Sequence, residues 1–207
     1  ALVMLNPGDE VILPTPYWVS YSDITKIAGG VPVEIPTSLE TNFKITPEQL
    51  EAAITPRTKM LWLSNPGNPS GAIYSKEELE GLAAVLRKYP NIYFLADEIY
   101  EHISYNGMPT SMASIEGMYE RTITVNGLSK AFAMPGWRMG YMGAPEWITK
   151  ACAKMQGQIT SGANTIAQRA SITALRAPLS QVQYMFDAYR KRRDLVYEPV
   201  SYTHLRA

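Results

Sequence analysis

Residues 60–97 read MLWLSNPGNPSGAIYSKEELEGLAAVLRKYPNIYFLAD, and they contain the clearest structural pattern of the chain. It starts with a short apolar run, Met60–Ser64, followed by a loop rich in Pro and Gly that suits neither a helix nor a central strand. Ser75 and Glu78 then form a capping box, and the apolar residues after them recur with helical period. A second apolar run, Ile92–Ala96, follows. Strand, helix and strand in this order predict a parallel βαβ unit.

The same alternation continues on both sides of this unit. Further strands are predicted at Glu10–Pro14, Val31–Ile35, Thr122–Val125 and Met139–Gly143. Further helices are predicted at Trp18–Ala28, Pro47–Ile54, Ile148–Ile159, Thr165–Leu175 and Gln181–Tyr197. This order predicts an α/β fold with a mostly parallel sheet and helices on both faces. Ligands of such sheets bind beyond the carboxyl ends of the strands, so we expect the reactive side chains just after strands.

The composition narrows the class of protein. The chain of 207 residues has 19 Lys and Arg against 19 Asp and Glu, and this neutral balance argues against non-specific binding to nucleic acid. No uncharged apolar stretch reaches the ~18 residues that a bilayer span needs, so no membrane partner is expected. Cys152 is the only cysteine, which favours a reducing, cytoplasmic location. With only His102 and His204, we expect neither a His-based metal site nor a Ser-His-Asp triad.

Three polar side chains follow predicted strands: Asn68, Asp97 and Lys130. Lys130 lies in a small, apolar loop bounded by Gly, an odd place for a lysine. Desolvation and nearby cations turn a lysine into a nucleophile able to form a Schiff base. Asp97 ends a buried strand and needs a partner; a pyridinium N–H is one, and that ion pair makes the ring an electron sink. Taken singly, Lys130 also fits a surface lysine and Asp97 a helix cap or a structural salt bridge.

Tyr100, Arg138 and Trp18, together with Asn68, complete the set. Tyr100, three residues beyond the aspartate, and Asn68 can both hydrogen-bond a phenolic oxygen. Arg138, eight residues beyond the lysine, suits a phosphate, and Trp18 can stack on a flat ring. Singly, these also fit a half-buried tyrosine, a turn asparagine, a surface arginine and a core tryptophan. Together the side chains meet the needs of pyridoxal 5′-phosphate: an amine, an acid for the ring nitrogen, donors for a phenolate and a cation for a phosphate.

The chain resembles the fold-type I, class I/II aminotransferases, which depend on pyridoxal phosphate. Gly127–Gly140 is similar to the lysine signature of that family, and Asp97–Tyr100 to its Asp-Glu-x-Tyr stretch. Asn65–Gly71 resembles its Asn-Pro-x-Asn-Pro-Thr-Gly loop, with Ser70 in place of Thr. The resemblance runs from about residue 5 to about residue 197, and its wording is nearest to the bacterial aspartate aminotransferase-like group.

The resemblance implies a role for each candidate residue. Lys130 would hold the cofactor as a Schiff base and later move the proton between the substrate and the cofactor. Asp97 would pair with the pyridine nitrogen, and Tyr100 and Asn68 would hydrogen-bond the phenolic oxygen. Trp18 would pack over the ring.

Arg138 would bind the cofactor phosphate, but the phosphate region also departs from the family pattern. Gly127 stands where many relatives carry a phosphate-binding hydroxyl, and Pro135 replaces a usual Thr. By the same resemblance, a first phosphate-binding loop would precede Ala1. A small domain, with the arginine that grips the substrate's α-carboxylate, would follow Tyr197.

These implications divide the chain into three parts. Residues 1–175 are expected to form a partial large cofactor-binding domain, and residues 176–198 a helix leading toward a missing small domain. Residues 199–207 resemble nothing in the family; we interpret them as an assembly or cloning artefact and expect them to be poorly ordered. The fragment alone is expected to be inactive.

The implied reaction moves an amino group from an amino acid, aspartate being the leading choice, to a 2-oxo acid such as 2-oxoglutarate, in a homodimer. Two alternatives stay open from the residues alone. A lyase or synthase of the same fold would keep the same cofactor residues. The effector domain of a transcription regulator would carry a DNA-binding helix-turn-helix before Ala1.

Overall fold

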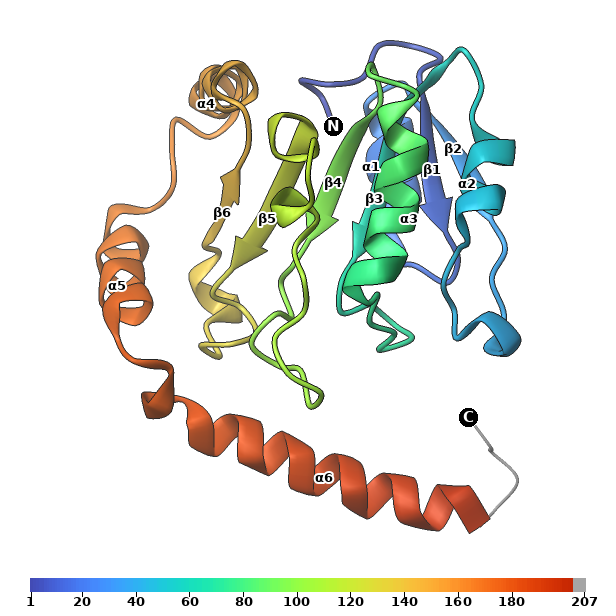
Figure 1. Ribbon diagram of the computed structural model, residues 1–207. Helices are drawn as coiled ribbons and strands as arrows, with labels where there is room; N and C mark the ends of the chain where they lie inside the picture. The colour runs from blue at the N-terminus through green and yellow to red at the C-terminus, as the bar shows by residue number, and fades with distance from the viewer. Residues whose placement is uncertain (203–207) are drawn as a thin grey trace.

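The computed structural model describes residues 1–202, with side chains through residue 198, and its centre is one six-stranded sheet (Figure 1). The strands are β1 (Glu10–Pro14), β2 (Val31–Ile35), β3 (Thr58–Ser64), β4 (Tyr93–Asp97), β5 (Thr122–Gly127) and β6 (Gly140–Gly143). Their order in space is β2-β1-β3-β4-β5-β6. All neighbours pair in parallel except β5 and β6, which are antiparallel.

The helices between the strands are α1 (Ser20–Ile27), α2 (Pro47–Ala53), α3 (Lys76–Arg87), α4 (Glu146–Ile159), α5 (Thr165–Arg176) and α6 (Gln183–Tyr202). The predicted capping box begins α3: the Ser75 hydroxyl accepts from the Glu78 N–H at 3.2 Å, and the Glu78 carboxylate accepts from the Ser75 N–H at 2.7 Å. These two bonds satisfy N–H groups that the first turn of a helix leaves without partners.

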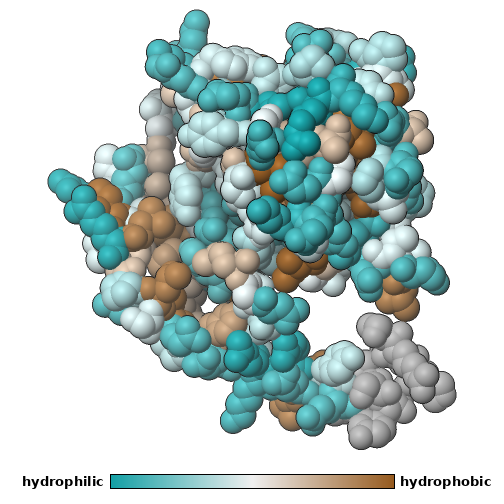
Figure 2. All heavy atoms as spheres, viewed as in Figure 1, coloured by the Kyte–Doolittle hydropathy of each residue, from teal (hydrophilic) through white to brown (hydrophobic). Residues whose placement is uncertain are grey.

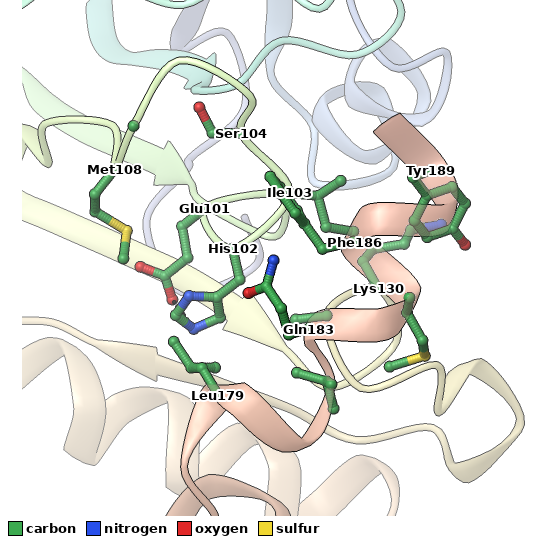
Figure 3. Close-up of a pocket in the computed structure, with 14 residues that line it drawn as sticks. Glu101, His102, Ile103, Ser104, Met108, Lys130, Leu179, Gln183, Phe186 and Tyr189 are labelled. Carbon is green, nitrogen blue, oxygen red and sulfur yellow. Dashed lines mark ion pairs between the residues drawn. The ribbon is translucent and has the colours of Figure 1, made fainter. Parts of the chain in front are cut away.

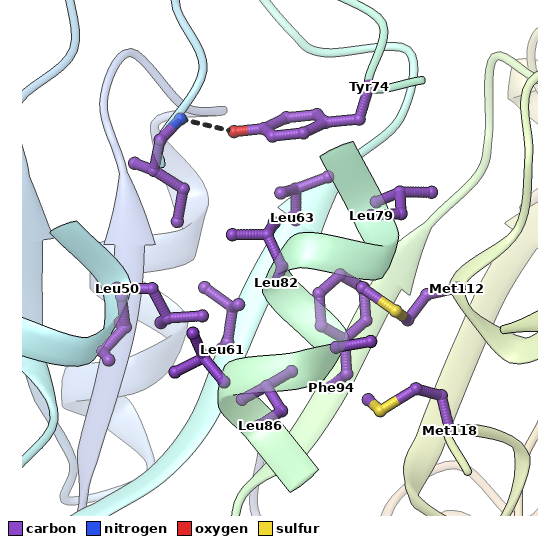
Figure 4. Packing of buried hydrophobic residues seen from close by; sticks show 14 of the residues in the cluster. Leu50, Leu61, Leu63, Tyr74, Leu79, Leu82, Leu86, Phe94, Met112 and Met118 are labelled. Carbon is purple, nitrogen blue, oxygen red and sulfur yellow. Dashed lines mark hydrogen bonds between the residues drawn. The ribbon is translucent and has the colours of Figure 1, made fainter. Parts of the chain in front are cut away.

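One core lies between α2, α3 and the sheet (Figure 4). Leu82 and Leu86 of α3 are fully buried, and so is Leu50 of α2. They share one cluster with Leu61 of β3 and Phe94 of β4. Alternate residues of a strand point to opposite faces, so this cluster uses only half of each strand.

The other half of each strand forms a second core. Met60 and Trp62, next to Leu61 in sequence, pack there together with Tyr21 of α1 and Ile148 of α4. Helices therefore cover both faces of the sheet. The predicted α/β fold with a mostly parallel sheet is confirmed.

Two features go beyond the sequence prediction. β6 pairs antiparallel, and most of its residues are exposed, so its apolar pattern carries little information on direction. The last helix was expected to end at Tyr197, because a following Pro lacks the N–H that a helix interior uses. Instead α6 continues through Tyr202, which makes the first residues of the expected disordered tail helical. The rest of that tail, residues 203–207, lies outside the described residues.

Large apolar side chains remain exposed on α4, α5 and α6. Figure 2 shows apolar side chains gathered over α5 and the turn that follows it. The most exposed members are Trp147, Ile159, Ile166, Leu175, Tyr184, Leu195, Val196 and Tyr197. Within residues 1–202, no helix combines the length and the apolar character that crossing a lipid bilayer requires.

Candidate active site

The strand order places a binding site at the carboxyl ends of β1 and β3. From β1 the chain first adds β2 on one side and then crosses to β3 on the other, so the order reverses between β1 and β3. Loops that leave such a point diverge and open a crevice. Trp18 follows β1, Asn68 follows β3, and Asp97 ends the adjacent β4. Three sequence-predicted residues therefore lie at this end of the sheet.

Asp97 is held at both carboxylate oxygens. The Tyr21 hydroxyl donates to Oδ2 at 2.6 Å, and the Ile99 N–H donates to Oδ1 at 3.3 Å. The backbone of Asp97 is also fixed. In the sheet, Asp97 pairs with Ser64 of β3 on one side and with Val125 of β5 on the other. The strand end thus presents an oriented carboxylate.

Tyr21 is a residue of this site that the sequence did not single out. It lies 76 residues before its partner, so no local pattern links the two. The sequence did contain one indication, because three of the five residues 17–21 are aromatic. Of these, only Trp18 was assigned a role. Trp18 itself is 43% exposed, and its ring meets the Tyr21 ring edge-on at 5.7 Å. It is therefore not the buried core residue that was the alternative for this position.

Asn68, Tyr100 and Lys130 form a second group of contacts. The Asn68 side-chain amide donates to the Tyr100 hydroxyl at 3.4 Å. The Lys130 ammonium nitrogen lies 5.7 Å from the centroid of the Tyr100 ring, and the lysine is exposed. The three residues come from loops after β3, β4 and β5, so the sheet brings together side chains that are far apart in sequence.

The loop that carries Asn68 is fixed by the buried Asn65. The Asn65 side chain accepts from the Tyr74 N–H at 3.0 Å and donates to the Thr110 carbonyl at 3.2 Å. Its backbone N–H donates to the Asp97 carbonyl at 3.1 Å. Because these bonds hold one end of the loop to two other segments, the direction of the loop is determined by the fold and not by Asn68 alone.

Arg138 lies apart from these two groups. It is exposed, has a positive φ of 52°, and donates to the Pro135 carbonyl at 2.8 Å. The predicted strand begins directly after it at Met139, whereas β6 begins at Gly140, after a short 3-10 turn at Pro135–Trp137. The hollow beside it is lined by Asn164 and Ala167 of the α5 start.

A cavity of about 230 Å³ adjoins Lys130 on the side of α6 (Figure 3). Ser104 and Met108 line it from the loop after β4, and Gln183 and Phe186 line it from α6. The helix is attached to that loop by aromatic contacts, since the Tyr105 ring lies 5.4 Å from Phe186. The exposed amine of Lys130 thus faces a space that part of α6 closes.

The chain matches the family model described as "Aminotransferase class I and II" over residues 1–204, and it belongs to that family. The resemblance seen in the sequence is therefore confirmed.

Curated relatives include the aspartate/prephenate aminotransferases of Cereibacter sphaeroides and Nitrosomonas europaea. The first is 48% identical over 93% of this chain and 48% of its own length, and the second is 50% identical over 94% and 50%. The chain thus spans about half the length of the curated relatives it matches. The likeness to aspartate aminotransferases expected from the sequence is confirmed.

Solved structures agree with the curated relatives. The aspartate aminotransferase of Rhizobium meliloti superposes with a TM-score of 0.91 at 48% identity, over 94% of this chain and 49% of that one. That of Thermus thermophilus with maleate gives a TM-score of 0.92 at 46% identity, over 97% and 52%. The sheet and helices described above are thus shared with these enzymes.

Proposed function

We propose that these residues form the central part of a transaminase that uses pyridoxal 5′-phosphate. The reaction would move an amino group from an amino acid, aspartate first, to a 2-oxo acid such as 2-oxoglutarate. Prephenate, named for two relatives, is a second acceptor to test. The observation that carries the proposal is the gathering of Asp97, Asn68, Tyr100 and Lys130 at one edge of the sheet.

The donor set fits pyridoxal phosphate. The two recorded donors to Asp97 are neutral groups, and none of the ion pairs recorded within residues 1–198 involves it, so its charge suits a pyridine N–H. The Asn68 amide nitrogen and the Tyr100 hydroxyl oxygen lie 3.4 Å apart. Two donor groups this close together can both hydrogen-bond one phenolic oxygen. When bound, the cofactor would supply an electron sink for breaking the C–H bond next to the substrate amino group.

Each residue then has a physical task. Lys130 Nζ would bind the cofactor covalently and, once released, take and return the proton at the substrate's Cα. Asp97 would hold the ring N–H, and Asn68 with Tyr100 would hold the ring oxygen. The exposed Trp18 would cover one face of the ring.

Arg138 would bind the phosphate through the guanidinium N–H groups that do not donate to Pro135. Its exposed position beside the start of α5 supports this task.

The proposal also includes a homodimer, which the exposed apolar side chains of α4–α6 support. It includes a cytoplasmic location, which the single free Cys152 supports.

A lyase, a synthase or a regulator domain of this fold is not favoured, because the relatives are named as aminotransferases. The test uses the full-length protein that contains this chain. It should absorb near the edge of the visible range, and borohydride should fix the chromophore to Lys130. Product analysis with aspartate and 2-oxoglutarate should then yield glutamate. Ammonia or a decarboxylated product in place of glutamate would contradict transamination.

A further inference from the structure

Tyr21 lies in a rigid aromatic setting that fixes its hydroxyl. Only 5% of the residue is exposed. Its ring meets Trp62 of β3 edge-on at 5.8 Å and Trp18 edge-on at 5.7 Å, and it lies nearly parallel to Tyr17 at 6.3 Å. Aromatic pairs at these separations are favourable, and three of them leave the ring little freedom. The hydroxyl donates to Asp97 Oδ2 at 2.6 Å.

The chemistry of this donor matters as much as its position. Burial and the neighbouring negative charge of Asp97 raise the pKa of Tyr21 well above its ordinary value. The hydroxyl therefore stays protonated and donates at every physiological pH. A lysine or arginine in this place would cancel the charge of Asp97, whereas a neutral hydroxyl orients the carboxylate and leaves its charge for the cofactor.

We infer that Tyr21 is a positioning residue for Asp97, one that aims the carboxylate at the cofactor ring nitrogen. The inference rests on the proposed cofactor function. A carboxylate held in line with the ring N–H would keep the proton on the ring nitrogen, where the positive charge would make the ring an electron sink.

The other titratable groups around Asp97 do not replace this donor. Glu98 follows it in sequence, and burial raises the pKa of that carboxyl. Tyr100, on the same loop, contacts Asn68. The Lys130 ammonium contacts the Tyr100 ring, 5.7 Å from its centroid. Within the described residues, Tyr21 is the one side chain recorded as a donor to Asp97.

The test compares Tyr21→Phe with a matched control, Tyr17→Phe, in the full-length protein. The neighbouring Tyr17 hydroxyl donates to Glu34 and not to Asp97. In Tyr21→Phe, the Asp97 carboxylate loses the bond that orients it and pairs less well with the ring N–H, so the pKa read from the visible chromophore should rise by about one unit. The value of kcat should fall about tenfold, with KM within about twofold, because Tyr21 touches Asp97 and not the substrate. Tyr17→Phe should match the unaltered protein.

A second variant covers the case in which Tyr21→Phe does not fold. Site-specific 3-fluorotyrosine at position 21 keeps the ring and the hydroxyl but makes the hydroxyl a stronger donor, so the chromophore pKa should move downward. Opposite shifts in the two variants, or this downward shift alone, support the inference. A chromophore pKa that stays at the unaltered value when position 21 is changed would overturn it and leave Tyr21 a packing residue. Absence of any chromophore in the unaltered protein would instead refute the proposed function.

Discussion

The ammonium nitrogen of Lys130 lies 5.7 Å from the centroid of the Tyr100 ring, although the two residues come from loops after different strands. A cation at this distance from the face of an aromatic ring is attracted to it. The contact places the amine against the loop that follows Asp97 at the end of β4. It therefore links the candidate nucleophile to the candidate partner of the ring nitrogen.

Replacing Lys130 with Ala should abolish both the chromophore and the reaction. We expect turnover to fall by on the order of 10³-fold or more, because both covalent attachment and proton transfer use Nζ. The measurement is borohydride reduction followed by peptide mapping, together with a transamination assay of the full-length protein. Lys154→Ala, at an exposed position of α4, is the control and should behave as the unaltered protein. Turnover at the unaltered rate in Lys130→Ala would show that the assignment is wrong.

Asp97→Asn should keep the shape of the side chain but remove its charge. Without the carboxylate the ring nitrogen loses its proton, so the electron sink weakens and the rate should fall by about 10²- to 10³-fold. The chromophore pKa should rise by more than in Tyr21→Phe. Spectroscopic titration and steady-state kinetics measure both effects, and Asp23→Asn on the exposed face of α1 is the control. An unchanged chromophore pKa in Asp97→Asn would remove Asp97 from the site.

Glu10 should make folding stability depend on pH. It is 3% exposed at the start of β1, and hydrogen bonds from Thr55, Arg57 and Thr58 lower the pKa of its carboxyl below the ordinary value. A depressed pKa in the folded state stabilises the fold above the unfolded pKa of about 4.3, and that stability is lost as pH falls through the folded value.

The corresponding variant is Glu10→Gln. It should lower the free energy of unfolding by about 2 kcal/mol at pH 7, and the difference should shrink below pH of about 4. Urea unfolding at both pH values measures this, with the exposed Glu120→Gln as a control that changes little at either. A difference that is the same at both pH values would mean that the charge of Glu10 contributes nothing.

Two glycines should respond to Ala in opposite directions. A Cβ on Gly127 would lie 2.9 Å from the Met139 carbonyl oxygen, so Gly127→Ala should force β5 and β6 apart and displace Lys130. A Cβ on Gly157 of α4 meets nothing within 4 Å, so Gly157→Ala should stabilise the helix by about 0.5–1 kcal/mol. Thermal unfolding separates the two cases. A Gly127→Ala variant as stable and as active as the unaltered protein would contradict the close approach.

Much of the fold was predictable because α/β units carry strong local signals. The Ser75 capping box and the apolar period after it predicted α3, and the buried runs predicted β3 and β4 within a few residues. The position of the site followed from the rule that ligands bind at strand ends. The direction of β6 did not follow, because four mostly exposed residues give no signal of how a strand pairs.

The candidate site was less predictable than the fold. Asp97, Asn68 and Lys130 were found because each follows a strand, whereas Tyr21 was missed because it lies within a helix and meets its partner only in three dimensions. Arg138 directly precedes a predicted strand, and nothing in the sequence indicated the positive φ that it takes at the end of a short turn. Loop conformation depends on contacts that sequence spacing does not encode.

The antiparallel pairing of β6 has a consequence for how the site is held together. A parallel strand at this place would need a crossover connection of about a dozen residues or more, and it would start at the opposite edge of the sheet. Instead Gly127 pairs with Gly140, so residues 128–139 form a loop whose two ends are tied to each other. Lys130 and Arg138 both lie in this closed loop, so a movement of the loop relative to the sheet displaces both side chains together. The spacing between the amine and the guanidinium is thereby set by a hairpin and not by the sheet as a whole.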